Sequence, residues 1–308
     1  MPDLLAEPLS PIDAATLWPQ LRRLSTEIVA TRGAENLLVS SGLAATGLTN
    51  LPPIPRTVVL GIRRGLTYRG VLVGRELDGG AAWEAVSLRI ARDKDDDAVT
   101  ALLEGAAPEV ARRSGRALIM RCPEGSPHAT AVRRAGLSAG RIERLFAVPR
   151  RHGSAGGQAF RSAGRADKNG IFRLYCRSVP EHIRRKEAPT LQDWRALLDS
   201  FDIEREFVLD GEGGLAAWVG FADRECRILV DSAAPASSLD SSLDLVETHV
   251  HRHGTLVLGE DQVDLERRAG DRGYSPLGVR LVYARRLALL NPLKEGVPVA
   301  ERAVPQTT

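Results

Sequence analysis

A stretch rich in Gly, Ser and Ala, RHGSAGGQAFRSAGRADKNG, separates the chain into two parts of similar length. It covers residues 151–170 of 308 and has no apolar period, which is typical of a flexible connection. Each part is long enough to bury a core of its own. We therefore predict two domains, over residues 1–150 and 171–290, with a linker over 151–170 and a tail over 291–308.

The two parts share one order of predicted elements. Apolar residues at Leu17, Leu21, Leu24 and Ile28 predict a first helix. The remaining patterns of the first part predict strands over 57–62, 68–75 and 83–91, a helix over 97–113, a strand over 117–122, a helix over 128–135 and a strand over 141–148. Those of the second part predict a strand over 171–177, helices over 180–186 and 191–199, strands over 206–209, 215–221 and 226–230, a helix over 239–251, a strand over 255–258, a helix over 263–269 and a strand over 279–285.

A weak internal repeat supports this parallel. Gly136-Leu137 and Phe146 are matched by Gly273-Tyr274 and Tyr283, and the differences 273 − 136 and 283 − 146 both equal 137. A shared offset indicates a duplication. The predicted fold class is α/β with a mixed sheet: two tandem domains, each a mostly antiparallel mixed sheet flanked by helices.

Composition excludes several classes of protein. Apolar residues make up 43% and charged residues 26% of the chain, and no apolar run is long enough to span a bilayer, so we predict no membrane partner. The first ten residues carry Asp3 and Glu7 where a signal peptide has a basic region, so we expect a cytoplasmic location. Cys122, Cys176 and Cys226 have no CxxC spacing, and we interpret them as core residues.

Two clusters of side chains suggest other functions. Arginines gather in the middle of the chain without interleaved aromatic residues, so we do not expect nucleic acid as a partner. These arginines are Arg141, Arg144, Arg150, Arg151, Arg161, Arg165, Arg184 and Arg185. His249 and His253 have the i, i+4 spacing of metal ligands, but no HExxH pattern accompanies them, and we predict no metal. GxSxG, P-loop and Rossmann motifs are absent.

The order of elements in Trp83–Arg150 carries a family resemblance. Its segments are WEAVSLRIA, AVTALLEGAAPEVARRSG, RALIMRC and HATAVRRAGL, followed by a final strand. This stretch resembles the acetyl-CoA-binding part of the GCN5-related N-acetyltransferase (GNAT) superfamily, and Cys226–Arg286 resembles a second, more diverged copy. The resemblance implies transfer of an acyl group from acetyl-CoA or another acyl-CoA to a small-molecule or peptide amine.

The family's signature residues are eroded. In the first half, the two glycines that the family uses to hold the coenzyme A pyrophosphate are replaced by Asp97 and Val99. Three carboxylates, Asp95 to Asp97, start this helix, and we interpret them as caps that repel phosphate. The tyrosine that many members use as general acid is replaced by Val132 and Ala269. No catalytic residue can therefore be assigned.

The corresponding helix start in the second half carries less negative charge, so it can tolerate an anion. Its loop, SAAPASSLDSS, lacks glycine and arginine, and Ser237 with Asp240 resembles a capping box. The candidate cofactor-binding residues are Leu229, Val230, Ser237, Ser238 and Leu239. Three functions stay open: an acyl-CoA N-acyltransferase, a non-catalytic binding or scaffolding module, and a transferase with another acyl donor. An enzyme should have an open cleft between its splayed central strands, and a scaffold should have that cleft filled.

Overall fold

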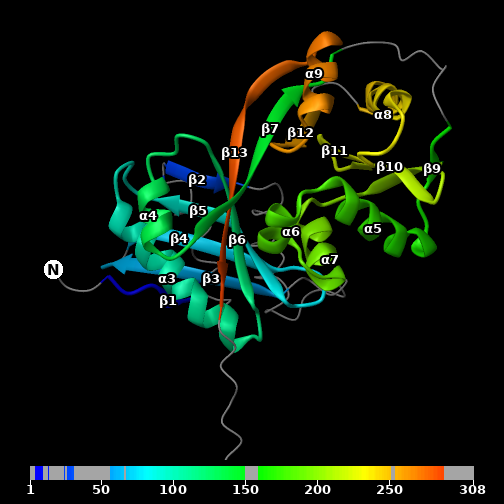
Figure 1. Ribbon diagram of the computed structural model, residues 1–308. Helices are drawn as coiled ribbons and strands as arrows, with labels where there is room; N and C mark the ends of the chain where they lie inside the picture. Colours follow the sequence, from blue (N-terminus) through cyan, green and yellow to red (C-terminus); the bar gives the residue numbers. More distant parts are fainter. Residues whose placement is uncertain are drawn as a thin grey trace, which may run out of the picture.

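One mixed sheet runs through the whole molecule. The computed structural model describes residues 4–9, 13, 24, 26–30, 56–65, 67–149, 159–250 and 254–287. Within these residues thirteen strands form a single sheet in the order β1-β3-β4-β5-β6-β13-β7-β12-β11-β10-β9-β8, and β2 pairs with β5 outside this path. The two halves of the chain occupy the two ends of the sheet (Figure 1).

The elements follow the predicted order closely. Those of the N-terminal half, up to residue 149, are β1 (Glu7–Pro8), β2 (Thr26–Ala30), β3 (Thr57–Arg64), β4 (Thr67–Glu76), β5 (Ala82–Ile90), α3 (Asp96–Arg112), β6 (Ala117–Pro123), α4 (Ala129–Arg134) and β7 (Ser138–Ala147). Those of the C-terminal half, from residue 159, are β8 (Arg161–Ser162), η1 (Arg165–Asp167), α5 (Lys168–Ser178), α6 (Glu181–Glu187), α7 (Leu191–Ser200), β9 (Arg205–Gly211), β10 (Gly214–Phe221), β11 (Glu225–Val230), α8 (Ala236–His249), β12 (Thr255–Gly259), α9 (Val263–Asp271) and β13 (Ser275–Arg286).

The last strands of the two halves are exchanged. Strand β7 ends the N-terminal half but pairs with β12 of the C-terminal half, and β13 ends the C-terminal half but pairs with β6 of the N-terminal half. The two strands also pair with each other over most of their length. They cross between the halves (Figure 1), so each half completes the sheet of the other.

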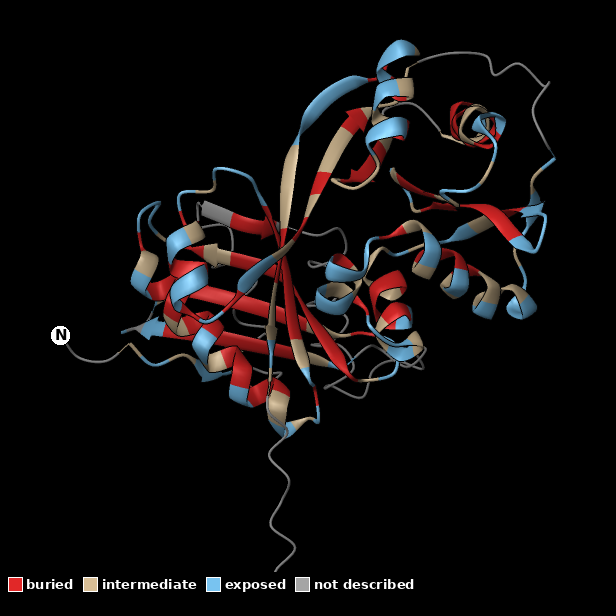
Figure 2. Ribbon diagram, in the orientation of Figure 1, coloured by how far each residue is buried: buried red, intermediate tan, exposed pale blue. Residues whose placement is uncertain are grey.

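Buried apolar residues form a separate core in each half (Figure 2). Helices α3 and α4 pack on the sheet of the N-terminal half, whereas α8 and α9 cover one face of the C-terminal sheet. Helices α5, α6 and α7 pack against β9, β10 and β11. Ala196 of α7 also packs against Leu77, Ile119 and Val282 on the sheet of the N-terminal half. The C-terminal half therefore contributes a helix as well as a strand to its neighbour.

Glycines at corresponding positions occupy the same kind of turn in both halves. Gly136 follows α4 with φ of 81°, and Gly273 follows α9 with φ of 84°. Both occupy the left-handed conformation that glycine adopts just after a helix, and both lead into the last strand of their half. The offset of 137 residues thus relates two turns with the same conformation.

Two predicted elements are wrong. Residues 171–177 form part of helix α5, because Ile171, Leu174 and Tyr175 are buried at helical spacing. Ile28 lies in β2, so the predicted first helix does not extend to it. Leu17 and Leu21 lie outside the described residues.

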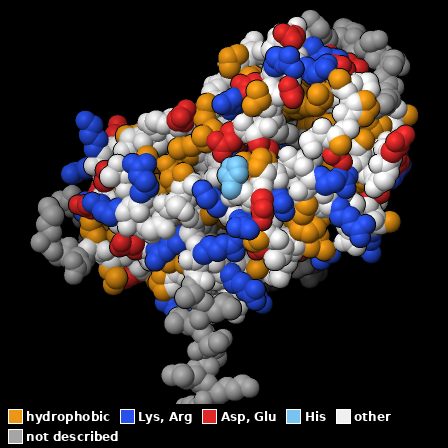
Figure 3. Space-filling model, in the orientation of Figure 1, with side chains coloured by type: hydrophobic (Ala, Val, Ile, Leu, Met, Phe, Trp, Pro, Cys, Tyr) orange, Lys and Arg blue, Asp and Glu red, His pale blue; other side chains and the backbone are white. Residues whose placement is uncertain are grey.

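The surface carries mixed charge. Lys and Arg side chains lie among Asp and Glu side chains on the face shown in Figure 3. Of the arginines grouped in the sequence, Arg141, Arg144, Arg161 and Arg185 are each ion-paired. Arg150 and Arg151 lie outside the described residues. In the part of the chain that the structure describes, no helix is long and apolar enough to cross a membrane.

Candidate functional site

The start of helix α3 is filled by the chain's own carboxylates. Asp95 accepts a hydrogen bond from the Ala98 amide at 3.2 Å and two from Arg69 at 2.5 and 2.6 Å. Burial alone would raise the pKa of Asp95, but these hydrogen bonds hold it below its ordinary value. The predicted capping role of Asp95 is thereby confirmed.

The other two carboxylates of this helix start are also paired. Asp96 lies 2.8 Å from Nδ1 of His128, and Asp97 lies 2.8 Å from Arg134. Three negative side chains, each bound to a basic group, thus surround the amides where the family holds a pyrophosphate. This helix start is unsuited to a further anion.

A strand fills the gap between the central strands of the N-terminal half. Strands β5 and β6 run parallel and pair over residues 82–84 and 117–119 only. Beyond this point, residues 87–90 of β5 pair with β2 instead. Ile28 and Val29 of β2 are buried in the core there. The splay between β5 and β6 is therefore closed by backbone and apolar side chains.

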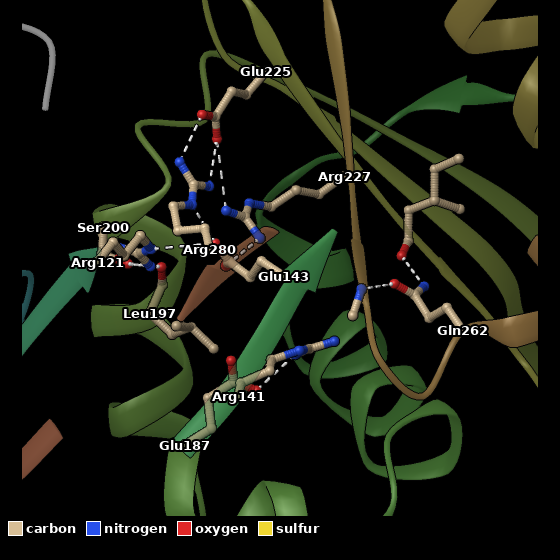
Figure 4. A network of polar contacts seen from close by, with 12 residues as sticks. Arg121, Arg141, Glu143, Glu187, Leu197, Ser200, Glu225, Arg227, Gln262 and Arg280 are labelled. Carbon is tan, nitrogen blue, oxygen red and sulfur yellow. Dashed lines mark hydrogen bonds and ion pairs between the residues drawn. The ribbon is translucent and has the colours of Figure 1, made fainter. Parts of the chain in front are cut away.

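The corresponding splay in the C-terminal half is bridged by one side chain. Strands β11 and β12 pair over residues 225–227 and 255–257, then diverge. The Gln262 amide donates to the Ile228 carbonyl at 2.7 Å and accepts from the Gly259 amide at 2.8 Å (Figure 4). These two backbone groups belong to the diverging strands, so Gln262 holds together the point where they separate.

A cavity of about 400 Å³ lies beside this bridge at the start of helix α8. We call it the C-terminal cleft, and residues lining it include Ser178, Val230, Ala236, Leu239, Asp261, Gln262 and Arg268. Helix α8 begins after Pro235 without a side-chain cap. Its first turn carries no acidic residue, so it leaves a positive helix end facing an open space.

Buried polar atoms without partners line the C-terminal cleft. Among the described residues, Asp261 Oδ2 and Ser178 Oγ are buried and make no hydrogen bond. The other carboxylate oxygen of Asp261 accepts from Arg141 at 3.2 Å, and Arg141 also donates to Glu187 at 2.8 Å. The Asp261 side chain is 3% exposed. Unsatisfied buried polar atoms are costly, and a ligand with polar groups would satisfy them.

The predicted cofactor residues fall in different surroundings. Val230 and Leu239 are half-buried and line the C-terminal cleft together, and Ser237 is exposed in the first turn of α8. Leu229 is buried in the core under α5 and α7. Ser238 is 1% exposed, and its carbonyl accepts from Ser242. The predicted capping box at Ser237 and Asp240 is wrong, because α8 already begins at Ala236.

The positions of the family's general acid lie in apolar cores. Val132 and Ala269 are fully buried. In the described residues no group of three or more His, Cys, Asp or Glu could hold a metal ion. His251 and His253 lie outside these residues, and His249 contacts the aromatic rings of Phe207 and Phe221.

A buried ionic network lies where the exchanged strands cross (Figure 4). Glu143 of β7 accepts from Arg227 of β11 at 2.8 Å and from Arg280 of β13 at 2.7 Å. Arg121 of β6 lies 3.8 Å from Glu143 and also pairs with Glu84 of β5. Burial alone would raise the pKa of Glu143, but these arginines hold it far below its ordinary range.

Sequence reasoning missed this network, although a signal was present. Arg121 and Arg227 stand inside otherwise apolar strands, ALIMRCP and ECRILV, and Glu84 stands inside AWEAVSLRI. Charged residues are seldom fully buried unless they are paired. An ion within an apolar strand therefore indicates a buried partner on a neighbouring strand.

Solved structures with a similar fold are N-acetyltransferases and related proteins. A tandem GNAT protein from the clavulanic acid biosynthesis pathway is 15% identical, with a TM-score of 0.51 over 92% of this chain and 98% of that chain. A GCN5-related N-acetyltransferase from Sphaerobacter thermophilus is 12% identical, with a TM-score of 0.51 over 93% and 96%. A Drosophila protein is 14% identical, with a TM-score of 0.51 over 93% and 99%. No protein-family model and no curated protein sequence matches the chain.

These likenesses cover nearly the whole chain at low sequence identity, so they establish the architecture rather than the chemistry. Together with the exchanged strands and the matched turns, they show that this chain has the tandem GNAT fold.

Proposed function

We propose that the protein is an acyl-CoA-dependent N-acyltransferase whose cofactor site lies in the C-terminal half. The observation that supports this most is the contrast between the two splays. In the N-terminal half the splay is filled by β2, and the helix start is occupied by Asp95, Asp96 and Asp97. In the C-terminal half the splay opens into a cavity of about 400 Å³ at an uncapped helix start.

The residues of the C-terminal cleft fit an acyl-CoA in part. The Ala236 and Ser237 amides at the start of α8 suit a phosphate, whereas the Ser238 amide already donates to the Pro235 carbonyl. Asp261 Oδ2 is an acceptor, so it would pair with an N–H or O–H group of the ligand and not with a phosphate. Asp231 and Asp264 also line the cleft. Bound there, acyl-CoA would supply the acyl group as a thioester. An amine would attack the thioester carbonyl, so that a C–N bond forms, the C–S bond breaks and the sulfur leaves as a thiolate.

The chain's own residues set limits on this reaction. The Gln262 side chain must release the Gly259 amide before that amide can donate to a ligand, whereas the Ile228 carbonyl keeps a second lone pair. Ala269 cannot protonate the leaving thiolate, so that proton would come from water or from the attacking amine. We infer a site that relies on orientation of the two reactants rather than on a strong general acid.

A non-catalytic binding module is the second candidate. The closed N-terminal splay favours it for that half, and the Gln262 bridge would favour it for the C-terminal half if the bridge never opened. Both candidates are consistent with the fold, because fold does not establish function. Binding of the cofactor separates them.

Ser237→Glu is expected to weaken binding of acetyl-CoA and of free coenzyme A by about tenfold or more, because a carboxylate at an exposed helix start repels a phosphate. Calorimetric titration measures this. Thr130→Glu is the matched control, because it places the same charge at an exposed helix start of the N-terminal half. Ser238→Glu is not a useful variant, because the Ser238 side chain is buried.

Unchanged affinity in Ser237→Glu would place the cofactor elsewhere. No heat from either ligand at millimolar concentration would contradict the acyl-CoA proposal and favour a binding module or a different acyl donor.

A further inference from the structure

A second cavity of about 400 Å³ lies where the two halves meet, and we call it the central pocket. The N-terminal half contributes Arg75, Glu84 and Arg121 to its lining. The C-terminal half contributes residues that include Ser200, Phe201, Glu225, Arg227 and Arg280. Neither half alone provides this pocket.

The inner wall of the central pocket has an excess of positive charge. Four arginines, Arg75, Arg121, Arg227 and Arg280, face only three carboxylates, those of Glu84, Glu143 and Glu225. The Arg121 side chain is 4% exposed and that of Arg227 is 11% exposed. Burial lowers the pKa of Arg227 in spite of Glu143 and Glu225, and Arg280 and Arg121 add to this lowering. Within ion-pair distance this wall thus has one more cation than carboxylates, and the Asp199 carboxylate attracts Arg75 from farther away.

The same arginines have donors to spare. Arg227 donates one hydrogen bond, to Glu143, and its Nη2 lies 3.6 Å from Glu225, beyond hydrogen-bond distance. A guanidinium carries five N–H groups arranged to match a carboxylate. The Phe201 ring completes this wall. Its centre lies 3.6 Å from the Arg227 guanidinium, which stacks on it.

The rim of the central pocket carries acidic side chains. Asp202, Asp223 and Arg224 line it and are exposed, and Asp223 already has an interaction partner. Asp202 adopts a left-handed conformation with φ of 57° directly after α7. A ligand with a negative group at its inner end, near the arginines, and a positive group at its outer end, near Asp202, fits this arrangement of charges.

The central pocket and the C-terminal cleft share the β11–β12 strand pair. Glu225 and Thr255, the first paired residues, line the pocket. Val230 and Gln262, beyond the last paired residues, line the cleft. The pocket therefore gives access to the same strands from the end opposite to the cleft.

We propose that the central pocket binds a small amino-carboxylate, with its carboxylate held by the inner arginines and its ammonium group near the rim. One surplus cation matches one carboxylate, whereas a phosphate dianion would leave an unbalanced negative charge. The claim that this ligand is the acyl acceptor rests on the proposed function. The claim that the pocket binds an amino-carboxylate does not.

The test uses three probes of one length: 5-aminopentanoate, pentanoate and pentylamine, titrated calorimetrically into the full-length protein without coenzyme A. We expect 5-aminopentanoate to bind most tightly, pentanoate to bind more weakly and pentylamine not to bind. Arg75→Gln should weaken binding of 5-aminopentanoate by about tenfold, because it removes the surplus charge while Glu84 keeps Arg121 as its partner. Arg56→Gln, which alters a 73% exposed arginine outside the pocket, is the control and should bind like the wild type.

Binding of pentylamine as tight as that of pentanoate, or no binding of any probe at millimolar concentration, would overturn the proposal. Binding of inorganic phosphate in preference to pentanoate would also overturn it. If Arg75→Gln unfolds, as seen by circular dichroism, Arg224→Gln at the rim replaces it and should weaken binding of pentanoate more than binding of 5-aminopentanoate, because loss of a rim cation disfavours a carboxylate and favours an ammonium group. The acyl-CoA titration described above is separate, so the pocket can be confirmed while the acyltransferase proposal fails, and the reverse.

Discussion

Glu143→Gln is expected to lower the free energy of unfolding by about 3–5 kcal/mol. Glu143 is 1% exposed and lies among Arg121, Arg227 and Arg280 at the crossing of the exchanged strands. A neutral amide would leave these buried guanidinium groups without their shared counter-charge. Chemical denaturation followed by circular dichroism measures the change, and Glu212→Gln in an exposed turn is the control, with an expected effect within about 0.5 kcal/mol.

The effect of this substitution should depend on pH. Because the pKa of Glu143 is lowered in the folded state, its stabilising contribution is complete above the unfolded pKa of about 4.3 and declines as the pH falls below that value. The difference between wild type and Glu143→Gln should therefore be constant from pH 6 to 8 and shrink in acid. A difference that grows in acid would show that Glu143 is not held ionised by the arginines.

Gly259→Ala is expected to destabilise the protein by about 2–4 kcal/mol. A Cβ at this position would overlap the Arg141 guanidinium and lie 2.5 Å from Asp261 Oδ1. Arg141 is buried and paired with both Glu187 and Asp261, so it cannot move without breaking an ion pair. Thermal unfolding and denaturant titration both measure this loss.

Gly270→Ala is the matched control, because the same atom is added elsewhere in the same half. Gly270 lies in α9, and a Cβ there meets nothing within 4 Å. Alanine is favoured over glycine in a helix, so this variant should be as stable as the wild type or more stable by up to about 1 kcal/mol. Equal destabilisation by both substitutions would refute the role given to the Gly259–Arg141 contact.

Most of the elements could be predicted from local patterns. Strands β3 to β7 and helices α3, α7 and α9 have apolar patterns that are visible in the sequence, and α3 and α7 also have capping residues. Strands β1 and β2 were not predicted. The position of Asp95 before the apolar period of α3 predicts its capping role. The prediction of a strand over residues 171–177 is wrong for a local reason. Aromatic and β-branched residues there favour a strand, but the buried residues are spaced as on one face of a helix.

The candidate site depends on contacts between distant residues. Nothing local to Gln262 shows that its amide bridges Ile228 and Gly259, and nothing local to residues 26–30 shows that they fill the N-terminal splay. The exchange of β7 and β13 depends on register across the sheet, which a single sequence does not encode in any short pattern. The predicted domain boundaries at residues 150 and 170 do not account for that exchange.

The exchanged strands also bear on the order in which the protein is synthesised. Domains usually fold as they leave the ribosome, with the first one complete before the second begins. Here the edge of β6 that faces away from β5 pairs with β13, which runs from Ser275 to Arg286. An unpaired strand edge favours pairing with another chain. The first half must therefore remain incomplete until β13 has been made, and a nascent chain that stalls before residue 275 would expose the edge most prone to joining a neighbour.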